Sequence, residues 1–232
     1  MKKFFFCLLI ATAFSVVNFS QSELEPRLVD EMRAIHCNDF LAHLDGFINE
    51  LQNDKSSEAY VVIFGKKGHE RENLIYEDWV RGHFAEREYS YRLNEIARGK
   101  LGDSIRIQFW IIHPGSKLPE VELEKWRFVL AENTKPYVFT RSDWNDGLCP
   151  SPEYLGLDNF SEFLNDNPKS SGNIVINETS KTKFETEKHR IQELLIKKYG
   201  ISDRRLRFFF QKKDLEKYSE YYFPNVEVWL LP

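Results

Sequence analysis

The side chains that could perform acid–base, nucleophilic or metal chemistry are spread along this sequence and form no complete motif. The run His69-Glu70-Arg71-Glu72-Asn73 begins like a zinc-protease helix, but the second histidine at the i+4 position is missing. Cys-x-x-Cys, Gly-x-Ser-x-Gly and phosphate-binding glycine loops are absent from the sequence, and Gly65-Lys66-Lys67-Gly68 is typical of a turn. The sequence therefore predicts no catalytic residue, no metal ligand and no cofactor.

Composition excludes several classes of protein. The chain has 232 residues, of which 42% are hydrophobic and 15% aromatic, so it can bury a sizeable core and is not disordered. Its 32 Lys+Arg against 36 Asp+Glu give a net charge of −4. Because this balance leaves no cationic excess to neutralise phosphates, we expect no nucleic acid partner.

Residues 1–22 have the pattern of a secretory signal peptide. A basic Met-Lys-Lys start precedes an apolar run from Phe4 to Val17 and then small polar residues. The run is shorter than the roughly 20 residues that a membrane-spanning helix needs. We expect the mature chain to be exported, periplasmic or secreted, and without a membrane span. The alternative is an anchor helix that is retained.

The second half of the sequence repeats the first. Corresponding segments occur in the same order in both halves and include an amphipathic stretch, an apolar run and a Trp-containing end. The matched pairs are Glu25–Val29 with Lys135–Phe139, Leu44–Leu51 with Leu157–Leu164, Ala59–Phe64 with Ile174–Ile176, and Phe109–Pro114 with Val228–Pro232. This order predicts a first α/β module over residues 25–115, a connector over 116–134 and a second module over 135–232.

Each copy is expected to follow the order strand, helix, strand, helix, strand, strand. In the second copy, Ser151 and Pro152 would open the first helix, and the capping-box spacing of Thr182 and Glu185 would open the second, which stops at Gly200. The expected strands of this copy are Tyr137–Thr140, Asn173–Asn177, Leu206–Phe210 and Val226–Leu230.

The first copy has the same order with weaker signals. Its second helix is expected over Glu70–Glu86, and its closing strands over Tyr89–Ile96 and Ile105–Ile112. Between the copies, Val121–Leu130 could form a helix or a strand, and we favour a short strand.

The segment Gln192–Arg207, with its Tyr199-Gly200-Ile201 end, resembles the helix-to-strand transition of OmpA-like domains. The resemblance implies an α/β (α+β sandwich) fold of two tandem OmpA-like β-α-β-α-β-β modules, each a mixed sheet with two helices on one face. Members of that family bind peptidoglycan through an Asp after the central strand and an Arg in the next helix, where the Arg clamps a carboxylate. Here Asn177-Glu178-Thr179-Ser180 follow the strand, and Glu187 or Lys188 takes the Arg position, with Arg190 as a possible substitute.

Cysteine usage predicts one disulfide. After removal of the signal peptide, Cys37 and Cys149 remain, and an even pair in an oxidising compartment suggests a bond between them. Both cysteines precede the repeated Leu-Asp at corresponding places, which favours a bond that links the two modules. The alternatives are two separate buried thiols or, less favoured, a Cys37 nucleophile assisted by His36.

Two aromatic clusters allow two interpretations. Phe208-Phe209-Phe210 cannot all face one side of a strand, because side chains alternate. Tyr218–Phe223 could be a stacking platform for a glycan or peptide, or could pack between the modules, which we favour.

The sequence as a whole predicts an exported, non-catalytic cell-envelope protein that binds an envelope protein or a cell-wall component. One alternative is a peptidoglycan-binding OmpA-like anchor with an altered site. The other is an envelope hydrolase whose catalytic carboxylates the sequence does not single out.

Overall fold

The computed structural model describes residues 25–131, 133–142, 156–212 and 226–232. The predicted signal peptide, Cys149, the predicted helix start at Ser151 and the Tyr218–Phe223 cluster lie outside the described residues. Within the described part, none of the helices is long and apolar enough to cross a membrane.

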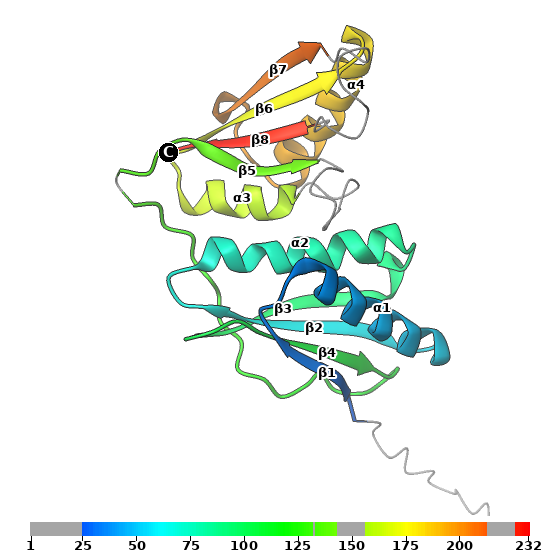
Figure 1. Ribbon diagram of the computed structural model, residues 1–232. Helices are drawn as coiled ribbons and strands as arrows, with labels where there is room; N and C mark the ends of the chain where they lie inside the picture. The colour runs from blue at the N-terminus through cyan, green and yellow to red at the C-terminus, as the bar shows by residue number, and fades with distance from the viewer. Residues whose placement is uncertain (1–24, 132, 143–155, 213–225) are drawn as a thin grey trace, which may run out of the picture.

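The first module alternates strands and helices before it closes with two consecutive strands (Figure 1). Its sheet has the strand order β1-β4-β2-β3, in which β2 and β3 are parallel and the other pairs are antiparallel. The elements are β1 (Arg27–Arg33), α1 (Cys37–Asn53), β2 (Glu58–Lys66), α2 (Glu70–Glu86), β3 (Leu93–Gly102) and β4 (Arg106–Ile112).

The second module has the same topology, and its sheet runs β5-β8-β6-β7 with β6 and β7 parallel. Its elements are β5 (Tyr137–Ser142), α3 (Leu157–Asp166), β6 (Ser171–Glu178), α4 (Lys181–Gln192) with a π-helical continuation over Glu193–Lys198, β7 (Leu206–Lys212) and β8 (Val226–Leu231). The predicted α/β fold class, two mixed sheets with helices packed against each, is therefore confirmed.

Strand periodicity decides which face of the first sheet the helices cover. Val61 and Ile63 of β2, with Phe109 of β4, point toward α1 and α2 and belong to one large buried cluster. The intervening residues, such as Val62 and Phe64, point to the opposite face, where they form a second, smaller cluster. The first sheet thus has a helix-covered face and a helix-free face.

An arginine occupies the same place in both modules and is buried in the first and half-buried in the second. Arg92 donates hydrogen bonds to the backbone carbonyl oxygens of Leu51, Asp54 and Ser57, where α1 ends. Arg205 makes the corresponding bonds to the carbonyl oxygens at the end of α3, which belong to Leu164, Asn167 and Ser170. In each module, one guanidinium therefore ties the last turn of the helix to the loop that leads into the next strand.

The connector wraps around the outer edge of β3. Leu123 pairs with Gly99 in an antiparallel bridge, flanked by hydrogen bonds from Lys100 N to Glu122 O and from Glu124 N to Arg98 O. Farther along, the fully buried Trp126 donates its indole N–H to Gly99 O at 2.9 Å. The connector therefore pairs with β3 at the Leu123 bridge alone, and the short strand that we favoured for Val121–Leu130 does not form as a continuous strand.

The two modules are joined through their helices. Helices α2 and α3 lie side by side between the two sheets, and the helix-free face of the first sheet points away from the second module (Figure 1). One continuous cluster of buried side chains runs through both modules. Phe128 of the connector stacks on Phe163 of α3, with ring centroids 5.5 Å apart, so the connector contributes to this shared core.

Three predicted boundaries are wrong. Helix α3 begins at Leu157, because Gly156 has a left-handed φ of +54° that a helix cannot continue. Helix α4 is capped by Ser180, whose hydroxyl accepts from Lys183 N, and not by Thr182. The strand expected from Tyr89 begins at Leu93, because Ser90–Arg92 form a 3-10 turn that brings Arg92 to the carbonyls of α1.

Candidate functional site

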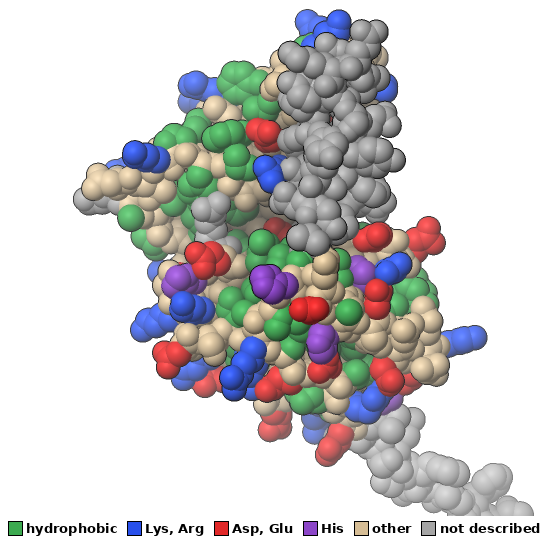
Figure 2. All heavy atoms as spheres, in the orientation of Figure 1, with side chains coloured by type: hydrophobic (Ala, Val, Ile, Leu, Met, Phe, Trp, Pro, Cys, Tyr) green, Lys and Arg blue, Asp and Glu red, His purple; other side chains and the backbone are tan. Residues whose placement is uncertain are grey.

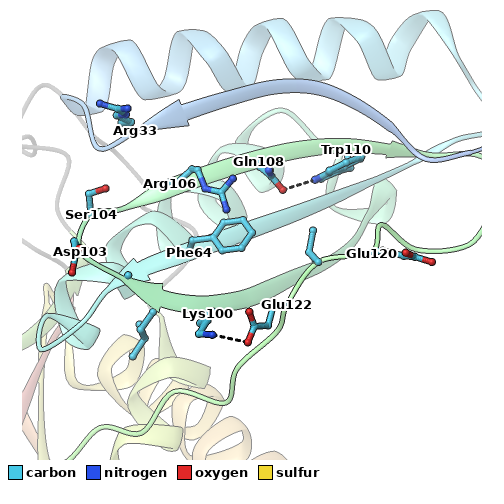
Figure 3. Close-up of a pocket in the computed structure, with 13 residues that line it drawn as sticks. Arg33, Phe64, Lys100, Asp103, Ser104, Arg106, Gln108, Trp110, Glu120 and Glu122 are labelled. Atoms are coloured by element: carbon cyan, nitrogen blue, oxygen red, sulfur yellow. Dashed lines mark hydrogen bonds and ion pairs between the residues drawn. The ribbon is translucent and has the colours of Figure 1, made fainter.

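A large open hollow lies on the helix-free face of the first sheet (Figure 3). Its volume is about 790 Å³, within the range of sites that bind small ligands. We call it the groove. All four strands of the first sheet and the connector contribute to its lining, which comprises Arg33, Phe64, Lys100–Ser104, Arg106, Gln108, Trp110 and Glu120–Val121-Glu122.

The alternation of β4 creates the floor of the groove. Ile107, Phe109 and Ile111 point into the core, so the residues between them must point to the helix-free face. Those residues are Arg106, Gln108 and Trp110. One strand therefore supplies both a wholly apolar row for the core and a polar and aromatic row for the groove.

Hydrogen bonds hold this floor in one arrangement (Figure 3). Trp110 Nε1 donates to Gln108 Oε1 at 3.2 Å, and Gln108 Nε2 donates to Glu31 Oε2 at 2.5 Å. Arg106 Nη1 reaches the same Glu31 oxygen at 3.1 Å, and its guanidinium lies 3.9 Å from the centre of the Phe64 ring. The aromatic and guanidinium planes are thus positioned before any ligand arrives.

The charges around the groove are partly compensated. Lys100 Nζ lies 2.8 Å from Glu122 Oε1, and this hydrogen bond raises the pKa of Lys100. Within the described residues, the exposed Arg33 has no ion-pair partner. Over the visible face of the first module, acidic, basic and histidine side chains are interspersed (Figure 2). Arg33 therefore stands out as a cation that is free to meet an acidic group on a ligand.

The chemistry of this lining suits binding. Its residues include aromatic planes, guanidinium groups and an ordered amide, which can stack on a flat or apolar group and hold a carboxylate or phosphate. The lining contains one serine, Ser104, but neither histidine nor cysteine, so it lacks a nucleophile–base pair of the usual kind.

A second group of charged side chains lies between the modules. Arg98 of β3 donates to Glu77 of α2 (Nε to Oε1, 2.6 Å) and to Glu162 of α3 (Nη1 to Oε2, 2.7 Å). Its remaining nitrogen donates to Asn159 Oδ1 at 3.0 Å. Burial opposes the charge of Arg98, yet the Glu77 and Glu162 carboxylates raise its pKa. For Glu77, burial raises the pKa of the carboxyl, and the hydrogen bond and charge of Arg98 offset only part of that increase.

Asp78 completes this inter-module cluster. Asn159 Nδ2 donates to Asp78 Oδ1 at 2.8 Å, and Arg81 lies 3.4 Å from Asp158 in the neighbouring ion pair. Burial raises the pKa of Asp78 to about 8, and the nearby Asp158 and Glu77 carboxylates act in the same direction. Because Arg98 and Asn159 connect side chains of the two modules, we interpret this cluster as the joint between them.

Asp78→Asn is expected to change the pH dependence of stability. Between about pH 4 and pH 8 the unfolded chain has released the Asp78 proton while the folded chain keeps it, so wild-type stability falls as pH rises through this window. Asparagine has no proton to lose and can still accept from Asn159. We expect its stability relative to wild type to rise by about 2–4 kcal/mol between pH 4.5 and pH 8.5.

Urea denaturation of both proteins at the two pH values measures this change. Asp103→Asn, which removes an exposed carboxylate from the edge of the groove, controls for the loss of one negative charge. If the difference in free energy of unfolding between Asp78→Asn and wild type is the same at both pH values, the prediction is wrong.

A Ser–His–Asp grouping also occurs in the first module. Ser57 Oγ lies 2.8 Å from His113 Nδ1 and donates to Asp54 Oδ2 at 2.6 Å. Asp54 approaches the same ring nitrogen at 3.0 Å, and the serine is fully buried. Since a catalytic triad uses both ring nitrogens and an accessible serine, this arrangement anchors the loop after α1 and does not form a triad.

The structure places the residues singled out in the sequence as follows. Cys37 is the first residue of α1 and is disulfide-bonded, whereas Cys7 and Cys149 lie outside the described residues, so the Cys37–Cys149 pairing stays a prediction. Arg190 forms a bidentate pair with Glu187 one turn earlier on α4. Phe208 and Phe210 face the helices, and Phe209 faces the opposite side of the sheet.

Sequence reasoning missed both the groove and the inter-module cluster. The alternation of Arg106, Gln108 and Trp110 with apolar residues was a usable signal for the groove floor. No sequence pattern connects Arg98 with Glu77 and Glu162, because the three side chains meet only through the packing of two modules.

Comparison with known proteins does not assign the chain to a family. No protein-family model matches it, and no curated protein shows significant sequence similarity to it.

Proposed function

We propose that this chain is an exported, non-catalytic binding protein of the cell envelope and that the groove is its binding site. The observation that carries the proposal is the preorganised floor, in which Arg106, Gln108 and Trp110 are fixed by hydrogen bonds at the bottom of an open hollow. The ligand is expected to combine a flat or apolar surface with an acidic group that meets Arg33.

The sequence supplies the envelope part of this proposal. Residues 1–22 would direct export, and the repeated β-α-β-α-β-β order supports degenerate OmpA-like modules. The peptidoglycan alternative gains little support, because the Arg190 guanidinium is already engaged by Glu187 and Ser180 caps its helix. An envelope protein is therefore the partner that we favour over the cell wall.

Arg33→Glu is expected to weaken ligand capture at least tenfold, because it reverses the one groove cation without an ion-pair partner among the described residues. The mature chain, immobilised through its C-terminus, is incubated with a detergent-solubilised envelope extract, and captured proteins are quantified. Lys55→Glu, which makes the same charge reversal in the exposed loop after α1, should capture as much as wild type.

Purified sacculi form the second arm of this experiment. Equal capture by wild type and Arg33→Glu would contradict the assignment of the groove as the site. Saturable binding to sacculi, with no envelope protein retained, would instead favour the peptidoglycan alternative.

A further inference from the structure

The outer edge of β7 in the second module corresponds to an edge that the chain itself covers in the first module. In the first module, the connector pairs with the outer edge of β3. In the second module, β7 is an edge strand of its sheet, and no described segment pairs with its outer edge. An unpaired edge strand is a ready template for another strand.

Trp110 on β4 and Trp229 on β8 occupy equivalent positions, and they show which residues of β3 and β7 correspond. The indole of Trp110 donates to Gln108, and the indole of Trp229 donates to Glu227, each two residues earlier on its strand. Trp110 and Trp229 each have a paired residue on the central strand, β2 or β6, and the residues of that strand are in turn paired with β3 or β7. Following these pairs in both sheets aligns β3 with β7 residue by residue. The equivalent pairs are Ala97 and Phe209, Arg98 and Phe210, and Lys100 and Lys212.

The connector covers both faces of the β3 edge. On the helix-free face, Val121 packs on the cluster that contains the buried Ala97. On the helix side, the Trp126 ring lies 5.4 Å from the Arg98 guanidinium. Between them, Glu122 pairs with Lys100. One extended segment thus supplies an apolar residue, an acid and an aromatic residue to one strand edge.

The β7 edge presents partners for the same three groups. Phe209 stands in place of Ala97 and is 44% exposed, and Phe210 stands in place of Arg98 and is 39% exposed. Lys212 repeats Lys100 and is exposed. Arg204 and Arg207 add positive charge along the same edge, whereas the connector carries Glu120, Glu122 and Glu124.

We propose that the outer edge of β7 binds an extended, acidic and apolar segment of a partner protein by antiparallel strand addition, as the connector binds β3. The backbone of the segment pairs with β7, an apolar side chain packs on Phe209, and an aromatic side chain packs on Phe210. A carboxylate pairs with Lys212 and sets the register. This surface lies in the other module from the groove and does not depend on the function proposed for it.

The test uses a peptide with the sequence of Lys117–Phe128, capped at the C-terminus and labelled with a fluorophore at the N-terminus. Fluorescence anisotropy is measured while the full chain is titrated in. We expect saturable binding that Lys212→Glu and Phe209→Ser each weaken at least tenfold. Leu28→Ser, which changes an exposed leucine on the edge strand β1, should leave the affinity unchanged.

Three results would overturn the proposal. The first is no saturable binding up to millimolar chain. The second is binding weakened by Lys100→Glu but not by Lys212→Glu, which would mean that the peptide displaces the connector from β3. The third is a concentration-dependent dimer that Lys212→Glu abolishes, measured by sedimentation, which would identify a second copy of this chain as the occupant of the edge. Thermal unfolding of Phe209→Ser confirms that the variant is folded.

Discussion

Arg98→Ala is expected to lower the free energy of unfolding by about 3–5 kcal/mol. The substitution removes the guanidinium that holds Glu77, whose side chain is only 2% exposed, and leaves that carboxylate in the interior without its cation. It also removes the bonds from β3 to Glu162 and Asn159 of α3. Chemical denaturation followed by circular dichroism measures the loss.

A matched pair of variants separates the buried charge from the surface contact. Glu162→Ala removes a partner that is about one-third exposed and should cost less than about 1 kcal/mol. The double variant Glu77→Leu with Arg98→Met replaces both charges by apolar groups and should recover most of the stability. If Arg98→Ala costs no more than Glu162→Ala, the buried Arg98–Glu77 pair does not stabilise the fold.

Arg92→Ala is expected to destabilise the first module by about 3–4 kcal/mol, because it leaves the carbonyls of Leu51, Asp54 and Ser57 without their shared donor. Arg205→Ala makes the same change in the second module. Since Arg205 is more exposed than Arg92, water can replace part of its hydrogen bonding, and we expect a smaller loss of about 2–3 kcal/mol.

Urea denaturation of both variants, compared with Arg87→Ala, checks this ranking. Arg87 pairs with Asp45 on the surface, so its removal should change stability by less than about 1 kcal/mol. The prediction fails if Arg92→Ala is no more destabilising than Arg87→Ala, or if Arg205→Ala costs more than Arg92→Ala.

The architecture was predictable because both modules use short-range patterns. Helix α2 was predicted over Glu70–Glu86, as observed, from its apolar stripe. The repeated order of segments predicted two sheets of the same topology. The errors lie at boundaries, where a single residue decides: the left-handed Gly156 delays α3, and Ser180 supplies the cap assigned to Thr182.

The candidate site was less predictable, because its residues meet only in the folded chain. Arg33, Phe64 and Trp110 come from three strands and are far apart in the sequence. Their proximity follows from the β1-β4-β2-β3 order, which no local pattern encodes. The 3-10 turn at Ser90–Arg92 was missed for the same reason, since the hydrogen bonds that Arg92 makes reach residues far away in the sequence.

The connector on β3 also has a consequence for the order in which the two sheet edges are covered as the chain folds. The first sheet closes when β4 pairs with β1, and the segment that shields β3 follows within about twenty residues of β4. The first module can therefore bury its aggregation-prone edge with its own connector, without any pairing from the second sheet. The β7 edge has no such cover among the described residues, so it is the strand that a chaperone or a neighbouring unfolded chain would meet.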